Sequence, residues 1–169
     1  MLCDSLNTWA RSHKFKEIDV RYIHLKKTNN TMHQTTDDKW RNQFHIQPPK
    51  GLLNDPNGLI YHDGLYHVFY QWHPDAPTHG LKYWNHVTSK DLVHWKQDSR
   101  ILKPDTIYDS HGAYSGSALV VDDNIELFYT GNTRTSDNLR IPYQLKASLS
   151  DEAIVNKTVI IDHIPQGYT

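Results

Sequence analysis

The residues best suited to chemistry lie in one short run, 51–58 (GLLNDPNG), around the carboxylate of Asp55. Pro56 fixes its own φ angle and restricts Asp55 to extended conformations, so the backbone sets the direction of this carboxylate. Asn57 and Gly58 then supply a turn ahead of a strand. A carboxylate that acts as a nucleophile must be held at a fixed angle and kept ionised, which this run can provide. The same residues are also ordinary turn chemistry without catalysis.

The composition limits the classes of function. The 169 residues fit one domain. The 18 basic and 19 acidic side chains nearly cancel, so no overall field would recruit nucleic acid or an anionic membrane. No apolar run reaches membrane-spanning length, and residues 1–10 lack the basic start and apolar stretch of a signal peptide. We therefore expect a cytoplasmic protein that binds neither nucleic acid nor a membrane.

Metal and disulfide chemistry have little support in the sequence. Cys3 is the single cysteine, which excludes a disulfide or a cysteine-based zinc site within one chain. The 12 histidines show no tight ligand spacing such as His-Glu-x-x-His. His67, His86 and His94 fall in expected strands, where structural histidines are common. We expect no metal site and no cofactor.

The chain divides near Trp40 into two parts of different composition. Residues 1–39 are polar and form an N-terminal extension that is irregular or contains a short helix over 4–16. Residues 40–169 alternate short apolar runs with turn residues, which is typical of an all-β domain.

Two expected β-hairpins repeat one pattern: an apolar strand, an Asp-led turn and a second apolar strand. Their strands are residues 59–62, 65–71, 118–121 and 125–129. Residues 84–89 and 91–95 lie between the hairpins and are predicted to form an outer strand pair. The repeat offset, from Gly58 to Gly116, is 58 residues. Four short strands at this period indicate blades of a β-propeller, although two hairpins in a sandwich would give a similar pattern.

Five motifs in a fixed order carry a family resemblance. They are 44–49 (FHIQPP), 52–58 (LLNDPNG), 69–72 (FYQW), 89–95 (SKDLVHW) and 114–118 (YSGSA). In order and spacing they resemble the β-fructofuranosidases of glycoside hydrolase family 32, and most of all its intracellular bacterial sucrose-6-phosphate hydrolases. The resemblance implies an all-β fold: the N-terminal portion, about two to three blades, of a five-bladed β-propeller.

The resemblance also implies roles for individual residues. Asp55 corresponds to the nucleophile of a retaining double displacement. Asn54 and Gln71 correspond to polar ligands of the fructosyl unit. Tyr114 and Ser115 correspond to an aromatic-serine pair that lines the same pocket. We expect these side chains to converge at one end of the propeller axis.

The glucosyl side of the pocket departs from the family pattern. Leu52 stands where many secreted members have Trp, and His79 stands where many have an aromatic contact. Leu53 belongs to the same motif and is expected beside the sugar. The implied ligand is a small-molecule sugar, sucrose 6-phosphate or sucrose. Basic residues near the motifs are candidates for contact with a substrate phosphate: Lys50, Lys82 and Arg134.

The other two carboxylates of the family have no counterpart in this chain. The acid/base is a Glu followed by Cys, and the stabilising Asp lies in Arg-Asp-Pro; neither motif occurs here. The three glutamates are Glu17, Glu126 and Glu152, and we expect Glu126 to face solvent from a strand and Glu152 to lie in a turn. The chain thus resembles an N-terminal fragment. The alternatives are a catalytically inactive fragment or sugar-binding remnant, and a non-enzymatic propeller interaction module.

A partial propeller has consequences for packing. Two blades and part of a third leave apolar faces uncovered, so Phe69, Tyr129 and the strand with Val120 and Val121 would each lack a neighbouring blade on one side. Such faces promote association, and we expect the isolated chain to be aggregation-prone or marginally stable. Three further side chains either line the central funnel or pack between blades: Trp72, Trp84 and His86.

Overall fold

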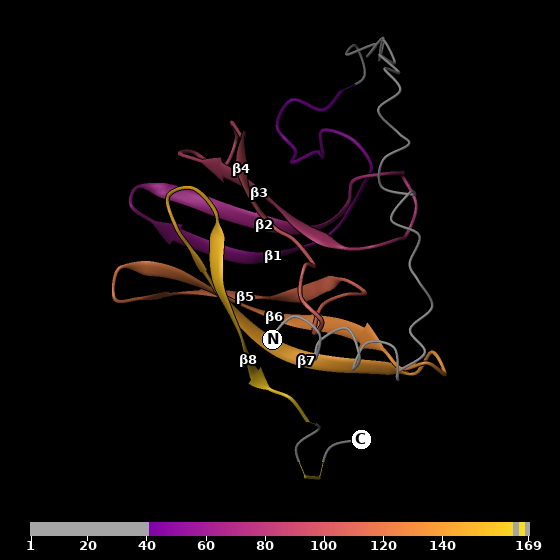
Figure 1. Cartoon of the computed structure of the whole chain (residues 1–169). Coiled ribbons are helices and arrows are strands. Elements are labelled where there is room, and N and C mark those ends of the chain that lie inside the picture. Colours follow the sequence, from indigo (N-terminus) through magenta and orange to yellow (C-terminus); the bar gives the residue numbers. More distant parts are fainter. Residues whose placement is uncertain (1–40, 164–165, 168–169) are drawn as a thin grey trace, which may run out of the picture. The chain divides into compact units, whose positions relative to one another are not determined.

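The computed structural model of the protein describes residues 41–163 and 166–167. These residues form two antiparallel sheets of four strands each (Figure 1). The strands are β1 (Leu52–His62), β2 (Leu65–His73), β3 (Tyr83–Ser89), β4 (Lys96–Leu102), β5 (Ala113–Val121), β6 (Asn124–Arg134), β7 (Arg140–Leu149) and β8 (Ile154–Ile161). The helix expected over 4–16 lies outside the described residues. Within the described part, no helix has the length and apolar character needed to cross a membrane.

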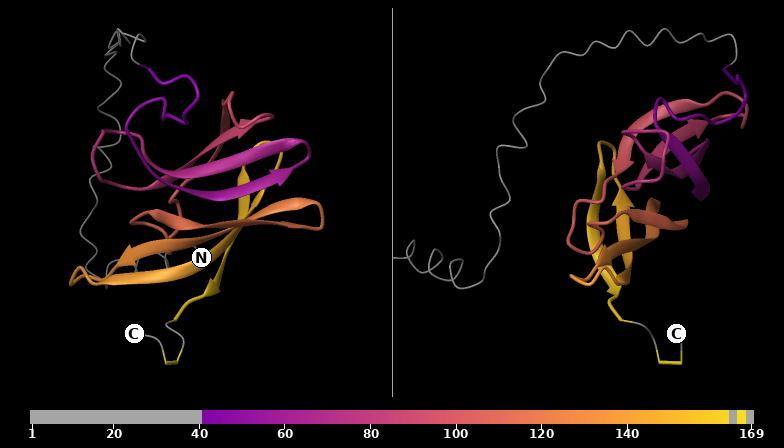
Figure 2. Two further views of the ribbon diagram at one scale, coloured as in Figure 1. Left: turned by 180° about the vertical axis from the view of Figure 1, so that it is seen from behind. Right: turned by 90° about the vertical axis from the view of Figure 1, so that its right-hand side faces the viewer.

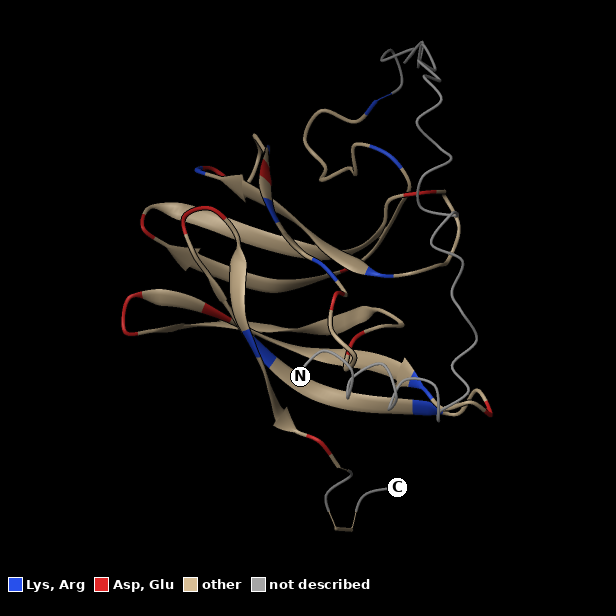
Figure 3. Ribbon diagram, in the orientation of Figure 1, with Lys and Arg blue, Asp and Glu red and all other residues tan. Residues whose placement is uncertain are grey.

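Each sheet is a simple meander, with strand orders β1-β2-β3-β4 and β5-β6-β7-β8. The prediction of an all-β fold with two repeated hairpins is therefore confirmed. Asp63 and Gly64 have φ angles of 47° and 74°, and Asp122 and Asp123 have 48° and 62°. Positive φ at both central residues is the geometry of a tight hairpin turn, which Asp and Gly tolerate. Figure 3 shows these acidic turns at the tips of the two hairpins.

The outer strand of the first sheet lies later in the chain than predicted. Residues 91–95 form a turn, and the outer strand is β4. Asp91 Oδ1 accepts hydrogen bonds from the backbone N–H groups of Val93 and His94, at 2.9 and 2.8 Å, and Leu92 has a φ of 61°. A side chain that satisfies the backbone in this way competes with strand pairing. His94, expected in a strand, therefore lies in the turn.

The two sheets pack against each other through a shared hydrophobic core, with β1 lying against β5 (Figures 1 and 2). Trp84 of β3 is fully buried in this core. Its ring lies 5.8 Å from that of Phe69 in its own sheet and 5.9 Å from that of Tyr129 in the other sheet. Its Nε1 donates a hydrogen bond to the backbone carbonyl of Tyr114 at 3.2 Å. Of the two roles considered for Trp84, packing between blades is the correct one.

The expectation of uncovered apolar faces is half right. Phe69 and Tyr129 are 0% and 1% exposed, because each packs in the core between the two sheets. Val120 and Val121 of β5 are 37% and 40% exposed. The two sheets therefore cover each other's facing sides, and apolar surface remains on strands away from that contact.

A chain of polar contacts joins the sheets at a second point. His67 Nδ1 lies 3.0 Å from His86 Nε2, and His86 Nδ1 lies 3.4 Å from Asp98 Oδ1. Arg100 donates to both Asp98 oxygens at 2.9 and 2.6 Å and to the carbonyl of Ser150, beyond β7, at 3.1 Å. Burial lowers the pKa of His86 to about 3, although the Asp98 carboxylate opposes this shift, and burial also lowers the pKa of His67. Both rings are therefore neutral at pH 7.

The Trp84→Ala substitution should destabilise the contact between the sheets. Removing a buried indole deletes its apolar contacts and leaves a cavity, which costs about 3–5 kcal/mol. Urea unfolding followed by circular dichroism measures the loss. Leu59→Ala, at a position 64% exposed on β1, is the control and should change the unfolding free energy by less than about 0.5 kcal/mol. Equal effects of the two changes would contradict the packing role.

The buried histidine pair should make the fold sensitive to mild acid. The pKa of His86 is depressed in the folded state, so between pH 6.5 and about pH 3 the unfolded chain binds a proton that the folded chain excludes, and stability falls as pH falls. His86→Gln keeps polar groups at this place but cannot titrate. We expect it to flatten the slope of unfolding free energy against pH over this range, whereas His45→Gln, at an exposed position before β1, should leave the slope unchanged.

Candidate active site

Strand β1 presents Asp55 through a β-bulge. Asn54 and Asp55 lie together opposite a single residue of β2, Gln71, where the strand pairing shifts by one. The run predicted as a turn is thus part of β1. A bulge bends the strand and redirects its side chains, and bulges are common beside active sites. Asn57, two residues further along the strand, donates from Nδ2 to the backbone carbonyl of Asp55 at 3.0 Å and so stabilises the bulge.

Strand β5 has a bulge at the corresponding place. Tyr114 pairs with Thr130 and Gly116 pairs with Tyr129, so Ser115 is the extra residue. Gly116 permits the close approach of β6 here, because a Cβ at this position would lie 1.9 Å from the carbonyl oxygen of Phe128. The bulge leaves Ser115 half-buried at the start of β5, where it faces β1.

Three strands bring their polar side chains into one hydrogen-bonded chain. Gln71 Nε2 of β2 donates to Ser115 Oγ of β5 at 2.7 Å, and Ser115 Oγ donates to Asp55 Oδ2 of β1 at 3.2 Å. A serine hydroxyl has one hydrogen, which is used on the carboxylate while its lone pairs accept from the amide. The structure therefore brings together Asp55, Gln71 and Ser115, which are 60 residues apart in the chain at the widest.

Asn54 is held by a lysine. Lys82 directly precedes β3 and is 5% exposed. Its Nζ donates to Asn54 Oδ1 at 2.5 Å, and its backbone carbonyl accepts from the N–H of Ala113, the first residue of β5, at 2.8 Å. Burial lowers the pKa of Lys82, and the charge of Asp55 opposes this shift. Lys82 thus lies beside both bulges.

Among the described residues, the side chains of the remaining predicted residues make no hydrogen bond to this network. Tyr114 is half-buried, with the guanidinium carbon of Arg140 4.7 Å from its ring centroid. Leu52 and Leu53 are half-buried at the start of β1, and Leu53 packs against a hydrophobic cluster of β2 and β3 side chains. His79 is exposed in the loop between β2 and β3. Among the described residues, no hydrogen bond joins the His79 side chain to the network.

The basic residues considered for a phosphate differ in their surroundings. The Lys50 backbone carbonyl accepts a hydrogen bond from Trp72 Nε1 at 2.8 Å. Trp72 is 8% exposed, so this bond joins the segment before β1 to a buried side chain of β2. Arg134 donates to the carbonyl of Asn138 in the β6–β7 turn at 2.9 Å. Of the three candidates, Lys82 is the one whose side chain contacts the Asp55 motif.

Sequence reasoning missed the role of Asp109, which is completely buried. Its Oδ1 accepts from the backbone N–H and hydroxyl of Thr106, both at 2.7 Å, and its Oδ2 accepts from the Tyr129 hydroxyl at 2.8 Å. Lys157 Nζ of β8 lies 3.3 Å from the same oxygen. Burial and the Asp109 carboxylate together raise the pKa of Tyr129. These contacts anchor the loop that leads into β5 and Ser115; an Asp within a run of turn residues gave no distinct signal.

Glu126 does not face solvent as predicted. Its side chain is 12% exposed and lies 3.3 Å from Lys146 Nζ, while the Ser148 hydroxyl donates to its carboxylate at 3.0 Å. The strand alternation placed it correctly on the side opposite the core, but neighbouring side chains of β7 cover it. Glu126 is therefore engaged within the second sheet rather than in the Asp55 network.

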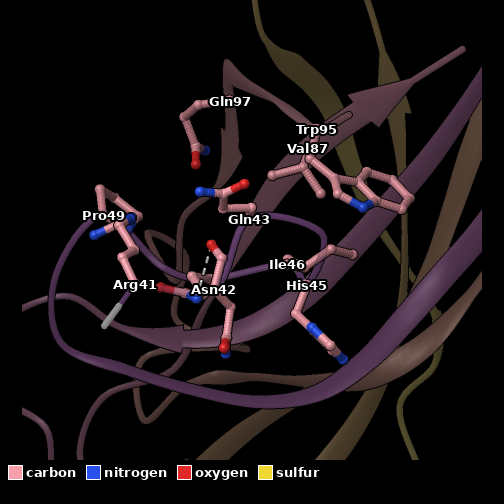
Figure 4. A pocket seen from close by; sticks show the side chains of 10 residues that line it. Arg41, Asn42, Gln43, His45, Ile46, Pro49, Val87, Trp95 and Gln97 are labelled. Carbon is pink, nitrogen blue, oxygen red and sulfur yellow. Dashed lines mark hydrogen bonds between the residues drawn. The ribbon is translucent and has the colours of Figure 1, made fainter. Parts of the chain in front are cut away.

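A separate pocket of about 250 Å³ lies between the segment before β1 and the outer strands of the first sheet. Figure 4 shows the amide groups of Gln43 and Gln97 facing each other across it, beside Trp95. None of the hydrogen-bonded residues around Asp55 lines this pocket. In the described part of the chain, no group of three or more His, Cys, Asp or Glu side chains is close enough to hold a metal ion.

Comparison with known protein families shows to which family the chain belongs. The model of the glycosyl hydrolases family 32 N-terminal domain matches residues 45–169. The chain belongs to glycosyl hydrolase family 32. The two sheets are thus the first blades of the N-terminal β-propeller of this glycosidase family, and the predicted family and fold are confirmed.

Individual relatives agree with this assignment. Sucrose-6-phosphate hydrolase of Pediococcus pentosaceus is 53% identical over 138 residues, which cover 80% of this chain and 28% of the relative. The structure of sucrose-6-phosphate hydrolase from Lactobacillus gasseri is 45% identical, with a TM-score of 0.67, over 73% of this chain and 25% of that one. A mutant family 32 β-fructofuranosidase of Bombyx mori in complex with sucrose is 32% identical, with a TM-score of 0.65, over 77% and 28%. This chain therefore spans between a quarter and a third of the length of these proteins.

Removal of the Ser115 hydroxyl should weaken the contact between the first two blades of this family 32 chain. In Ser115→Ala the amide of Gln71, which is 8% exposed, loses its acceptor, and an unsatisfied buried donor costs about 1–3 kcal/mol. The unfolding free energy in urea measures this loss. Ser117→Ala, at an exposed position on the same strand, is the matched control and should change stability by less than about 0.5 kcal/mol. A silent Ser115→Ala would show that the hydrogen bonds are not maintained in solution.

Proposed function

We propose that this chain supplies the nucleophile half of a β-fructofuranosidase site that acts on sucrose 6-phosphate or sucrose by a retaining mechanism. The observation that carries the proposal is the hydrogen bond from Ser115 Oγ to Asp55 Oδ2. It orients an exposed carboxylate at the contact between the two sheets. Family membership supports the reaction class, and the sucrose-6-phosphate hydrolase relatives support the substrate.

In the proposed first step, Asp55 Oδ1 attacks the anomeric carbon of the fructosyl unit. Ser115 holds Oδ2 and leaves Oδ1 as the attacking atom. The bond between this carbon and the bridging oxygen breaks, and an acid carboxyl gives its proton to the leaving glucosyl oxygen. The product is a fructosyl ester of Asp55. In the second step water, deprotonated by the same acid/base group, attacks the anomeric carbon and releases fructose and the ionised carboxylate.

Among the described residues, neither glutamate is a candidate for the acid/base group beside Asp55. Glu126 is engaged by Lys146 and Ser148 in the second sheet, and Glu152 lies in the exposed β7–β8 turn. The stabilising Asp of the family likewise lacks its Arg-Asp-Pro motif in this sequence. The proposal therefore places both groups on polypeptide other than these 169 residues.

A second candidate function follows from the same observation. A chain that presents Asp55, Asn54 and Gln71 without an acid/base group could bind a fructosyl unit and not cleave it. Assay of the 169-residue chain tests the feature that both functions share, which is the lack of an acid/base group. We expect no useful turnover of sucrose or sucrose 6-phosphate, because general acid catalysis alone contributes about 10²–10⁴-fold. Turnover at the rate of an ordinary enzyme would overturn the assignment of the acid/base group.

A chimeric enzyme tests the nucleophile. Residues 41–163 of this chain replace their counterparts in the Lactobacillus gasseri sucrose-6-phosphate hydrolase, whose structure is 45% identical. We expect the chimera to hydrolyse sucrose 6-phosphate and Asp55→Asn to lower kcat by at least about a thousandfold, as removal of a nucleophile does.

The control is Asp63→Asn, at the exposed tip of the first hairpin, where Asn also tolerates the φ of 47°. It should leave kcat within about twofold of the parent chimera, since a surface substitution of this kind perturbs little. An active Asp55→Asn chimera would exclude Asp55 as the nucleophile. A folded but inactive parent chimera would favour the sugar-binding reading.

A further inference from the structure

Lys82 is the one buried lysine beside the Asp55 motif in the described part of the chain. Its ammonium group reaches from the start of β3 to Asn54 Oδ1 at 2.5 Å. Within the described residues, no carboxylate lies at ion-pair distance from it, so its direct partner is a neutral amide. A buried charge without an ionic partner is costly. Its place at the site therefore calls for a role that a neutral side chain would not fill.

The chemistry of the two groups defines such a role. An ammonium group only donates hydrogen bonds, whereas an amide has an accepting oxygen and a donating nitrogen at two ends of similar shape. A donor-only neighbour at 2.5 Å from Asn54 Oδ1 fixes which end of this amide faces Lys82. The Nδ2 group, with its two hydrogens, is then turned away from Lys82.

We propose that Lys82 is a positioning residue that orients the Asn54 amide so that Nδ2 donates to an oxygen of the fructosyl unit held beside Asp55. The inference rests on the proposed function, since it concerns the same pocket. It assigns Asn54 the role of donor rather than acceptor. It also gives Lys82 a role other than contact with the substrate phosphate, because its ammonium is used on the fructosyl side of the pocket.

Lys82 is itself fixed by the fold. Its backbone carbonyl accepts from Ala113 N–H at 2.8 Å, so the segment before β3 is joined to the start of β5. Gly112 allows this approach, because a Cβ there would lie 3.3 Å from the Lys82 backbone nitrogen, at a φ of 126° that favours glycine. The residue that orients Asn54 is therefore positioned by the same contact between the blades that brings Ser115 to Asp55.

The experiment is a double-mutant cycle in the chimera described above, with Lys82→Met and Asn54→Ala. Lys82→Met keeps the length of the side chain and removes its donors. We expect it to raise KM for sucrose and for sucrose 6-phosphate equally, by about tenfold, which is the worth of one hydrogen bond to a ligand. The kcat should stay within about twofold, because a contact made equally in the ground and transition states changes KM alone.

The cycle identifies the residue through which Lys82 acts. In the Asn54→Ala background, Lys82→Met should change KM by less than about twofold, because the amide it orients is gone. The dissociation constant of fructose, measured by calorimetry, should follow the same pattern. This measurement needs no turnover, so failure of the hydrolytic function and failure of the inference are read separately. Lys96→Met, on the exposed part of β4, is the matched control and should change neither quantity.

Two outcomes would overturn the proposal. A loss confined to sucrose 6-phosphate, with sucrose and fructose unaffected, would make Lys82 a ligand of the phosphate. Equal and additive losses in the two backgrounds, about a hundredfold in the double variant, would show that Lys82 acts independently of Asn54.

Discussion

The burial of Trp84 between the two sheets is the interaction on which the geometry of the site depends. Its ring contacts Phe69 in one sheet and Tyr129 in the other, and its Nε1 donates to the carbonyl of Tyr114. Apolar burial holds the sheets together but has no direction. Hydrogen bonds add direction: the one from Trp84 and the one from Ala113 N–H to the Lys82 carbonyl both join β5 to β3 or the residue before it. Ser115 lies next to these contacts, 3.2 Å from Asp55.

In both blades, the side chains of the candidate site lie at a β-bulge. In a regular antiparallel ladder, side chains alternate between the faces of the sheet, and Asn54 and Asp55 would point in opposite directions. With two residues opposite Gln71, the strand bends locally, and the side chains of Asp55, Gln71 and Ser115 reach one another from three strands. The bulge at Ser115 does the same in the second blade. The candidate site thus forms where two β-bulges come together, and not in a loop.

The buried and half-buried charges of the two sheets serve different purposes. Asp98 is paired with Arg100, whose hydrogen bonds bring the pKa of Asp98 down to about 2 although burial acts in the opposite direction. Asp109 is satisfied by Thr106, Tyr129 and Lys157 and anchors a loop. These pairs offset the cost of desolvation by direct partners. Lys82, whose direct partner is a neutral amide, is the exception, and this difference underlies its proposed role in orienting Asn54.

Local sequence signals predicted the all-β fold and the two hairpins and singled out Asp55, whereas the resemblance to family 32 pointed to Asn54, Gln71 and Ser115. Asp-led turns and alternating apolar residues act over a few neighbours, so a sequence displays them directly. The turn at 91–95 was mistaken for a strand because its hydrogen bonds run from a side chain to the backbone.

Only the tertiary structure decided which distant side chains meet. Three hydrogen bonds join residues at least 20 positions apart in the chain. They run from Ser115 to Asp55, from Tyr129 to Asp109 and from Lys82 to Asn54. Such contacts depend on the register of the bulges and on the packing of Trp84 between the sheets. Neither has a local pattern in the sequence, because both result from how whole strands fit together.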